Sequence, residues 1–241
     1  GGTILAEPKD ENGKITISSL KRGYGEPSYR GKLELYSTSN GVAVVNELLL
    51  EEYLYAVVPG EMPASYELEA LKAQAVCARS YAAKQTRDYA YPEYNAHVDD
   101  STLFQVYGNS LEMESAVQAV NETAGEKVWH GGEVATTYYF STSCGQTTSA
   151  EAWGTAPSEA NSYLKSVKVE GENGAYEAEL PWHRWTAKIP EKLLSQLISA
   201  NTQTNIGNLT SVEVTKRGPG DIVLQIVASG DQGSVTGETE N

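Results

Sequence analysis

The strongest constraint on the fold is an alanine-rich segment with helical periodicity, which follows a short turn bounded by prolines. Residues 65–88 place apolar side chains on one face at the spacing of an α-helix, and Ser65 stands where an N-cap is favoured. The apolar positions on that face are Leu68, Leu71, Ala75, Ala78 and Ala82. We therefore predict one long helix here, shortly after the rigid link Glu61-Met62-Pro63.

The chain before this helix has the pattern of a small β unit. Alternating apolar and polar residues over 15–17 and 29–36 predict strands, and a turn at 39–41 predicts a hairpin with a strand at 42–45. Residues 1–13 are rich in Gly, Asp and Glu, so we expect them to be frayed.

The segments after the β unit alternate between helical, extended and irregular patterns. A short helix is predicted over 48–58, with Pro59-Gly60 as its stop. Loops are expected at residues 89–110 and 141–160, helices at 111–121 and 190–198, and strands at 126–129, 134–140, 163–169, 209–216 and 222–227. The fold class is mixed α+β, with a small N-terminal β unit, a central long helix at a cleft and a β-rich C-terminal part.

Composition excludes several classes of function. The 241-residue chain has 18 basic and 32 acidic residues, and its formal net charge is −14. It lacks the basic surface of a nucleic-acid-binding protein and gives no basis for adhesion to an anionic membrane. No apolar run reaches about 18 residues, so no membrane-spanning helix is predicted. The chain opens with Gly1-Gly2-Thr3, which we interpret as an artificial or processed start.

Most standard catalytic motifs are missing from the sequence, and a Ser-x-x-Lys match at 162–165 is best explained by chance. There is no P-loop, no Gly-x-Gly-x-x-Gly fingerprint, no Gly-x-Ser-x-Gly elbow and no His-Glu-x-x-His. Cys77 and Cys144 permit one disulfide, but we favour two unpaired thiols. Two weaker alternatives are a nucleophile pair of Cys144 with a histidine and an oxygen-rich cation site at His97, Asp99 and Asp100; for the latter we favour a solvated polar loop.

Glu61 is the carboxylate in the most unusual sequence context. Gly60 precedes it and Met62-Pro63 follows, so prolines restrict the backbone on both sides while the glycine leaves room for a ligand. Such a clamp suits a general acid held at a cleft. From these residues alone, the alternative is a surface glutamate in a proline-rich turn.

Four motifs resemble those of the stage II sporulation protein D family. They are Tyr-Leu-x-x-Val-Val-Pro-x-Glu-Met-Pro at 53–63, Glu-Ala-Leu-Lys-Ala-Gln-Ala-Val at 69–76 with Ala-Arg-Ser-Tyr-Ala at 78–82, Gln-Val-Tyr-Gly at 105–108, and Tyr-Phe-Ser-Thr-Ser-Cys-Gly at 139–145 with Trp-Gly at 153–154. The chain departs from the family at Asn109 and Cys144, where Gly is frequent. We assign 1–30 to a flexible N-terminus with the first strand, and 31–241 to a catalytic domain of this family with two lobes around a groove and a C-terminus short of the full domain.

The resemblance implies a secreted wall protein that cleaves the β-1,4 bond between N-acetylmuramic acid (MurNAc) and N-acetylglucosamine (GlcNAc) in peptidoglycan. Glu61 occupies the position of the family's catalytic residue. A lytic transglycosylase needs only this carboxylate as acid and base and forms 1,6-anhydroMurNAc, whereas ordinary glycosidases use two carboxylates. The alternatives are a non-catalytic glycan-binding module that enhances an amidase, and a hydrolase with Asp99 or Asp100 as second carboxylate.

Contacts to substrate and partners also follow from the resemblance. The candidate substrate-binding side chains are Tyr66, Arg79, Tyr81, Gln105, Tyr107, Ser141, Thr142, Ser143 and Trp153. For Arg79 and Tyr81 an equal alternative is that they pin the helix to neighbouring loops. The implied partners are peptide-stripped glycan strands, an amidase and membrane proteins of the sporulation engulfment machinery. The implied location is extracellular or septal, with any membrane anchor outside this chain.

Some members of the family bind zinc through Cys and His in the loop around the third motif. This chain has no Cys between His97 and Asn109. We therefore expect no metal, or at most a weak site at His97, Asp99 and Asp100.

Overall fold

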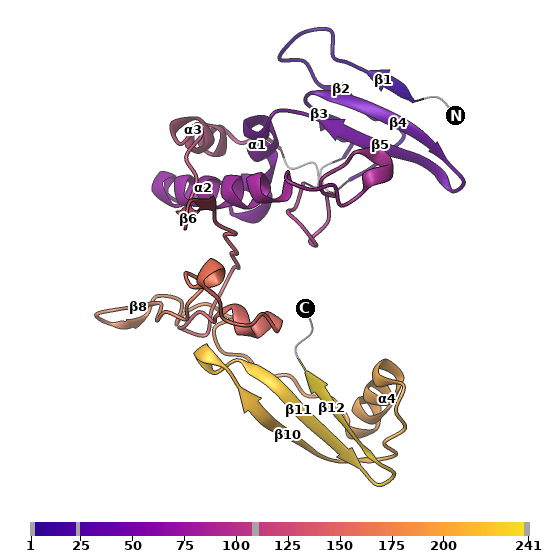
Figure 1. Cartoon of the computed structure of the whole chain (residues 1–241), viewed down its shortest axis with the longest axis vertical. Coiled ribbons are helices and arrows are strands. Elements are labelled where there is room, and N and C mark those ends of the chain that lie inside the picture. Colours follow the sequence, from indigo (N-terminus) through magenta and orange to yellow (C-terminus); the bar gives the residue numbers. More distant parts are fainter. Residues whose placement is uncertain (1–2, 23–24, 108–110, 239–241) are drawn as a thin grey trace. The chain divides into compact units, whose positions relative to one another are not determined.

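The computed structural model describes residues 3–22, 25–107 and 111–238 (Figure 1). The chain divides into two compact units, Gly1–Tyr139 (unit 1) and Phe140–Asn241 (unit 2), and each is described here by itself. Both combine helices with small antiparallel sheets, which confirms the mixed α+β class with an N-terminal β unit and a β-rich C-terminal part. Gly108 of the third motif and the neighbouring Asn109 lie outside the described residues.

Unit 1 opens with an antiparallel sheet in the strand order β1-β4-β5. The strands of the unit's N-terminal part are β1 (Ile4–Ala6), β2 (Ile15–Thr16), β3 (Ser28–Tyr29), β4 (Lys32–Thr38) and β5 (Gly41–Glu47), and β2 pairs with β3. The predicted hairpin is confirmed, since β4 and β5 pair up to Thr38 and Gly41. A frayed N-terminus is wrong for β1, which pairs Leu5 with Glu34. Three residues are too few to show a period, and pairing with a distant strand creates this one.

Three helices form the core of unit 1. They are α1 (Leu50–Glu61), α2 (Leu68–Gln85) and α3 (Glu114–Glu122), which lie together in Figure 1. The fully buried residues that they share are Leu54, Val57, Val58, Leu71, Ala75, Ala78, Ala116, Ala119 and Val120. The predicted apolar face of α2 is confirmed, because Leu71, Ala75 and Ala78 all lie in this core. Small side chains on both α2 and α3 allow the two helices to pack closely.

The end of α1 differs from the prediction. The helix continues through Pro59 and Gly60 and ends at Glu61, so Pro59-Gly60 does not stop it. A proline near the C-terminus of a helix removes one backbone donor, and the last turn still closes through the Met62 N–H, which donates to Val58 O at 2.9 Å. Glu61 is therefore a helical residue. The next helix, α2, begins two residues later than predicted, since its N-cap is Glu67 and not Ser65.

Replacing Gly31 by alanine is expected to lower the free energy of unfolding by about 2–3 kcal/mol. Gly31 joins β3 to β4 with φ of +68°, and an added Cβ would overlap Glu47 O and Leu48 Cβ. Gly131→Ala is the matched control, since Gly131 has φ of +57° and no atom within 4 Å of the added Cβ. It should cost only the backbone strain of about 1 kcal/mol. Denaturant unfolding measures both, and equal losses would contradict the overlap.

Among the described residues, the remaining strands of unit 1 are two residues long, whereas unit 2 has two strands of that length, three longer strands and one α-helix. They are β6 (Trp129–His130) and β7 (Glu133–Val134) in unit 1, and β8 (Glu170–Gly171), β9 (Gly174–Ala175), α4 (Glu191–Thr202), β10 (Leu209–Arg217), β11 (Val223–Gly230) and β12 (Ser234–Glu238) in unit 2. Strands β10, β11 and β12 form one antiparallel sheet in that order. The α4 hydroxyl of Ser195 accepts a 3.0 Å hydrogen bond from the Leu209 N–H, which fixes the helix to the start of β10.

The predicted C-terminal helix and hairpin are confirmed by α4, β10 and β11, whereas two predicted strands are wrong. Residues 134–140 contribute only the end of β7, and 163–169 form a single bridge between Lys168 and Gln146. Both segments are rich in residues that favour strands, but a strand also needs a partner of equal length, and neither has one. In the described part of the chain, no helix combines the length and apolarity needed to cross a bilayer.

Candidate active site

Glu61 lies half-buried at the C-terminal end of α1. Its Oε1 accepts a hydrogen bond from the backbone N–H of Val106, with an N···O distance of 2.8 Å. Val106 belongs to the long loop before α3, so this bond ties the end of the helix to a segment distant in sequence. Among the described residues, Oε2 has no hydrogen-bond partner. One carboxylate oxygen is therefore fixed by the main chain, and the other remains available to a ligand.

Gln105, next to Val106, connects two tyrosines in the interior. Its Nε2 donates to the Tyr139 hydroxyl at 2.9 Å and to Ala78 O at 3.3 Å, and its Oε1 accepts from the Tyr53 hydroxyl at 3.3 Å. Gln105 is only 2% exposed. Its amide thus holds tyrosines from α1 and from the end of unit 1 in place, which makes it a positioning residue in this structure.

The negative charge of the Glu61 carboxylate acts on three tyrosines, Tyr53, Tyr81 and Tyr139. Glu61 and these tyrosines are called the Glu61 cluster. Burial raises the pKa of Tyr53, Tyr81 and Tyr139 above the usual value of a phenol, and the negative charge of Glu61 adds to the increase at each of them. The three hydroxyls stay protonated at neutral pH. A carboxylate with one free oxygen can exchange a proton with a bound sugar, and the Tyr139 hydroxyl, which accepts from Gln105, keeps its own proton to donate.

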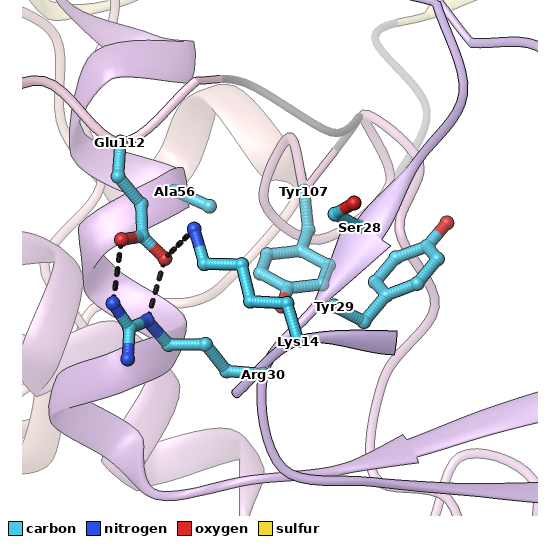
Figure 2. Close-up of a pocket in the computed structure, with 7 residues that line it drawn as sticks. All are labelled: Lys14, Ser28, Tyr29, Arg30, Ala56, Tyr107 and Glu112. Carbon is cyan, nitrogen blue, oxygen red and sulfur yellow. Dashed lines mark hydrogen bonds and ion pairs between the residues drawn. The ribbon is translucent and has the colours of Figure 1, made fainter. Parts of the chain in front are cut away.

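Neighbouring aromatic rings continue from this cluster toward the N-terminal strands. Tyr53 stacks on Tyr107 with ring centroids 5.0 Å apart, and Tyr107 lies 6.2 Å from Tyr29. Tyr107 and Tyr29 line a cavity of about 20 Å³ beside the carboxylate of Glu112 (Figure 2). Arg30 donates two hydrogen bonds to Glu112, at 2.6 and 2.8 Å, and holds the pKa of this carboxyl below its usual range. Tyr107 therefore packs beside the cluster, and its contact with substrate stays a prediction.

Raising the pH above about 10 is expected to destabilise unit 1. Burial raises the pKa of Tyr53, Tyr107 and Tyr139 above 10.0 in the folded chain. Above pH 10 the unfolded chain releases protons that the folded chain retains, so the free energy of unfolding falls as the pH rises. Below pH 10 both states are protonated and these groups have no effect. Thermal unfolding between pH 8 and 11 measures the slope.

The Tyr53→Phe variant should have a shallower slope above pH 10, since it lacks one of the titrating phenols. Tyr176→Phe is the matched control, because Tyr176 is 77% exposed. If both variants keep the full slope, burial of Tyr53 is not the cause of alkaline unfolding.

Arg79 lies in the interior and pins α2 to its neighbours. The residue is 0% exposed, and its Nη2 forms an ion pair with Glu51 at 2.8 Å. Its other donors reach Val120 O at 3.1 Å, Glu126 O at 3.2 Å and the Thr123 hydroxyl at 3.4 Å. Of the two alternatives for Arg79, the structure shows the pinning contact. Tyr81, on the same helix, is half-buried beside the Glu61 cluster.

The other candidate substrate contacts are described within their own units. Tyr66 is 55% exposed in the turn between α1 and α2. In unit 2, Ser141 is exposed and Thr142 half-buried, and Trp153 is 40% exposed in a short 3-10 helix. Ser143 is buried, and its N–H and hydroxyl both donate to the Glu177 carboxylate. Their contacts with substrate stay predictions.

The candidate cation site at the His97 loop does not form. His97 stacks on Tyr89, and its Nδ1 lies 3.0 Å from Asp88 O. Asp99 accepts hydrogen bonds from Tyr91 and Ser101, and Asp100 pairs with Arg22. Over residues 3–22, 25–107 and 111–238, no group of three or more His, Cys, Asp and Glu side chains could hold a metal ion. These three side chains therefore do not fit a zinc site.

The two cysteines are free thiols, as expected. The Sγ of Cys144 faces the carbonyl oxygens of Gln146 and Gly220 at 3.9 and 3.8 Å. His183, the histidine of this region, places Nδ1 3.1 Å from Ser143 O. Within the described residues of unit 2, Cys144 therefore forms no hydrogen bond with His183.

Two residues of the cluster, Tyr53 and Tyr139, were not predicted as site residues. Both are part of the quoted motifs, but a motif does not show which of its members meet. Tyr53 precedes Glu61 by eight residues on α1, a spacing of little more than two helical turns. That spacing was the available signal, and it was missed because the helix was expected to end at Pro59-Gly60.

Comparison with known proteins gives one family. A family model described as Stage II sporulation protein (SpoIID) matches residues 38–130. Stage II sporulation protein D of Bacillus subtilis is 28% identical over 95% of this chain, and that of Bacillus amyloliquefaciens is 30% identical over 95%. An amidase enhancer of Bacillus subtilis is 36% identical over 64% of the chain. The chain spans 62%, 67% and 23% of the lengths of these three proteins.

Proposed function

Because the chain belongs to the SpoIID family of stage II sporulation proteins, we propose that it acts on bacterial peptidoglycan as a lytic transglycosylase. The substrate bond is the β-1,4 bond between MurNAc and GlcNAc, in glycan already stripped of its stem peptides. The acid and base are one residue, Glu61. The observation that carries the proposal is a carboxylate with one oxygen fixed by the Val106 N–H, among protonated tyrosines.

The proposed reaction needs only one carboxyl group. The protonated Glu61 donates its proton to the glycosidic oxygen as the bond from the anomeric carbon to that oxygen breaks. The departing GlcNAc leaves with a free 4-hydroxyl. The carboxylate of Glu61 then accepts the proton of the MurNAc 6-hydroxyl while that oxygen bonds to the anomeric carbon. The product is 1,6-anhydroMurNAc, no water is consumed, and Glu61 returns to its protonated form.

The surroundings of Glu61 support a single-carboxylate mechanism. Glu61 is the carboxylate whose charge acts on Tyr53, Tyr81 and Tyr139 together. Asp99 and Asp100, the candidates for a second carboxylate, are engaged by Tyr91 and Arg22. Hydrolysis in an inverting or retaining glycosidase requires such a second acid at a fixed distance across the sugar.

The proposed setting is remodelling of the cell wall during sporulation, with an amidase that strips the glycan and with membrane proteins of the engulfment machinery. The proposed location is extracellular or septal. A second candidate function is that of a non-catalytic glycan-binding enhancer of an amidase. The relative named amidase enhancer, which shares 36% identity over 176 residues, favours this candidate.

Product analysis separates these functions. The protein is incubated with amidase-stripped glycan strands, and the soluble fragments are identified by mass spectrometry. Fragments that end in 1,6-anhydroMurNAc support the lytic transglycosylase. Fragments with reducing ends, which carry one added water, identify a hydrolase instead. Glycan binding without fragments, together with stimulation of an added amidase, identifies an enhancer.

A further inference from the structure

Unit 2 carries exposed aromatic side chains that the proposed reaction does not use. Trp182 and Trp185 are 69% and 68% exposed. Arg184 stands between them in the sequence and lines a cavity of about 530 Å³. We propose that Trp182, Arg184 and Trp185 form a further glycan-binding site, which takes a muramyl residue with a free lactyl carboxylate. The site rests on the proposed function, because its ligand is part of the same substrate.

Backbone contacts fix the turn that carries these side chains. The His183 N–H donates to Leu180 O at 3.0 Å and closes the turn. His183 Nδ1 lies 3.1 Å from Ser143 O and must be the donor there, since a carbonyl oxygen only accepts. Arg184 Nη1 donates to Cys144 O at 3.0 Å. His183 and Arg184 thus hold this segment on the neighbouring loop, while the indoles of Trp182 and Trp185 remain in solvent. A ligand meets aromatic groups on an already ordered backbone, which reduces the entropy lost on binding.

The cavity contains one cation that no acid neutralises. Lys168 pairs with Glu170 at 3.3 Å, and Asp221 pairs with Arg217 at 3.4 Å. Arg184 forms no ion pair with any described residue, and its hydrogen bonds go through Nη1 to two backbone carbonyl oxygens. Its Nε and Nη2 donors are left for an anion, and this edge of a guanidinium matches the two oxygens of a carboxylate.

Peptide-stripped glycan has the two features that this site recognises. Removal of the stem peptide leaves a lactyl carboxylate on each muramyl residue, which can pair with Arg184. Pyranose rings present C–H faces, which pack on exposed indoles such as those of Trp182 and Trp185. The chain carries a net charge of −14, so an anionic strand is repelled from most of its surface and needs a local cation for attachment. Charge complementarity therefore favours this glycan over a neutral polysaccharide.

Binding is measured with the Glu61→Gln protein, which prevents cleavage during the experiment. The probes are amidase-stripped glycan strands and the same strands with their carboxylates converted to methylamides. Substituting both Trp182→Ala and Trp185→Ala is expected to raise Kd about tenfold for both probes, because stacking does not depend on the carboxylate. Arg184→Gln is expected to raise Kd about tenfold for the carboxylate probe and to leave the methylamide probe unchanged.

Two matched controls test the location of the site. Trp129→Ala removes an indole of similar exposure, 62%, from unit 1, and Lys188→Gln removes a positive charge from the same segment of unit 2. Neither should change Kd by more than about twofold. Unchanged glycan affinity in the tryptophan variant overturns the site, and if amidase binding is lost instead, the surface belongs to a protein partner. Equal losses in Lys188→Gln and Arg184→Gln also overturn it, since they indicate general charge attraction.

The binding experiment and the product analysis fail independently. Glycan binding that depends on Trp182, Arg184 and Trp185, without anhydro products from the native protein, contradicts the proposed reaction and supports the site. Anhydro products with unchanged affinity in both the tryptophan variant and Arg184→Gln support the reaction and contradict the site.

Discussion

Replacing Glu61 by glutamine is expected to reduce the rate of anhydroMurNAc formation by about 10²–10⁴-fold. The variant keeps the size and shape of the side chain and an oxygen that accepts the hydrogen bond of the Val106 N–H, seen at 2.8 Å in the native chain. It loses the proton that must reach the glycosidic oxygen and the base that must accept the proton of the 6-hydroxyl. The rate is measured from anhydro ends formed on amidase-stripped glycan.

The structure also predicts that Glu61→Gln loses catalysis but keeps its stability and its affinity for glycan. Glu61 forms no ion pair in the described chain and lies half-buried, so Glu61→Gln should change the free energy of unfolding by less than about 1 kcal/mol. Its Kd for glycan should also stay within a few-fold of the native value.

Glu67→Gln serves as the matched control, since Glu67 is an exposed carboxylate just before α2. It should keep the full rate. A Glu61→Gln protein that retains most of its activity, with the rate lost instead in Asp99→Asn or Asp100→Asn, would contradict the assignment of Glu61 and point to a two-carboxylate hydrolase.

Local sequence patterns predicted the elements that local interactions determine. The helical period over 65–88 identified α2 (Leu68–Gln85) and its buried face, and the turn at 39–41 identified the hairpin of unit 1. Patterns failed where a distant partner decides the outcome. Strand β1 exists because it pairs with β4, and the segment 163–169 is not a strand because its neighbours offer only one bridge.

In the candidate site too, local sequence predicted some features and contacts between distant residues decided the others. The flanking prolines singled out Glu61, but the segment before it is the last turn of a helix, with Pro59 inside that helix. The bond from Val106 to Glu61 and the bonds of Gln105 to tyrosines join residues 34 to 52 positions apart, and no spacing rule predicts such contacts. For Arg79, only burial in the folded chain decides between substrate contact and structural role.

Replacing Arg79 by methionine is expected to lower the free energy of unfolding by about 3–5 kcal/mol. Arg79 is 0% exposed, and its guanidinium supplies donors to Glu51, to the backbone carbonyls of Val120 and Glu126 and to Thr123. Methionine fills similar volume but donates nothing. It removes a donor from Val120 O, from Glu126 O and from the Thr123 hydroxyl and leaves the Glu51 carboxylate without its counter-charge, and each such loss costs about 1–3 kcal/mol.

Two further variants are compared with Arg79→Met. Arg87→Met removes an exposed arginine that pairs with Glu133, and it should cost less than about 1 kcal/mol because solvent screens the pair. Arg79→Lys keeps the charge but cannot reach several acceptors at once, so it should recover only part of the stability. Denaturant unfolding measures all three.

If Arg79→Met unfolds like the native protein and instead binds glycan weakly, Arg79 contacts substrate. Loss of stability with native glycan affinity at low temperature shows that Arg79 acts by holding α2 against α1 and α3, which fixes the helix that carries Tyr81 beside Glu61.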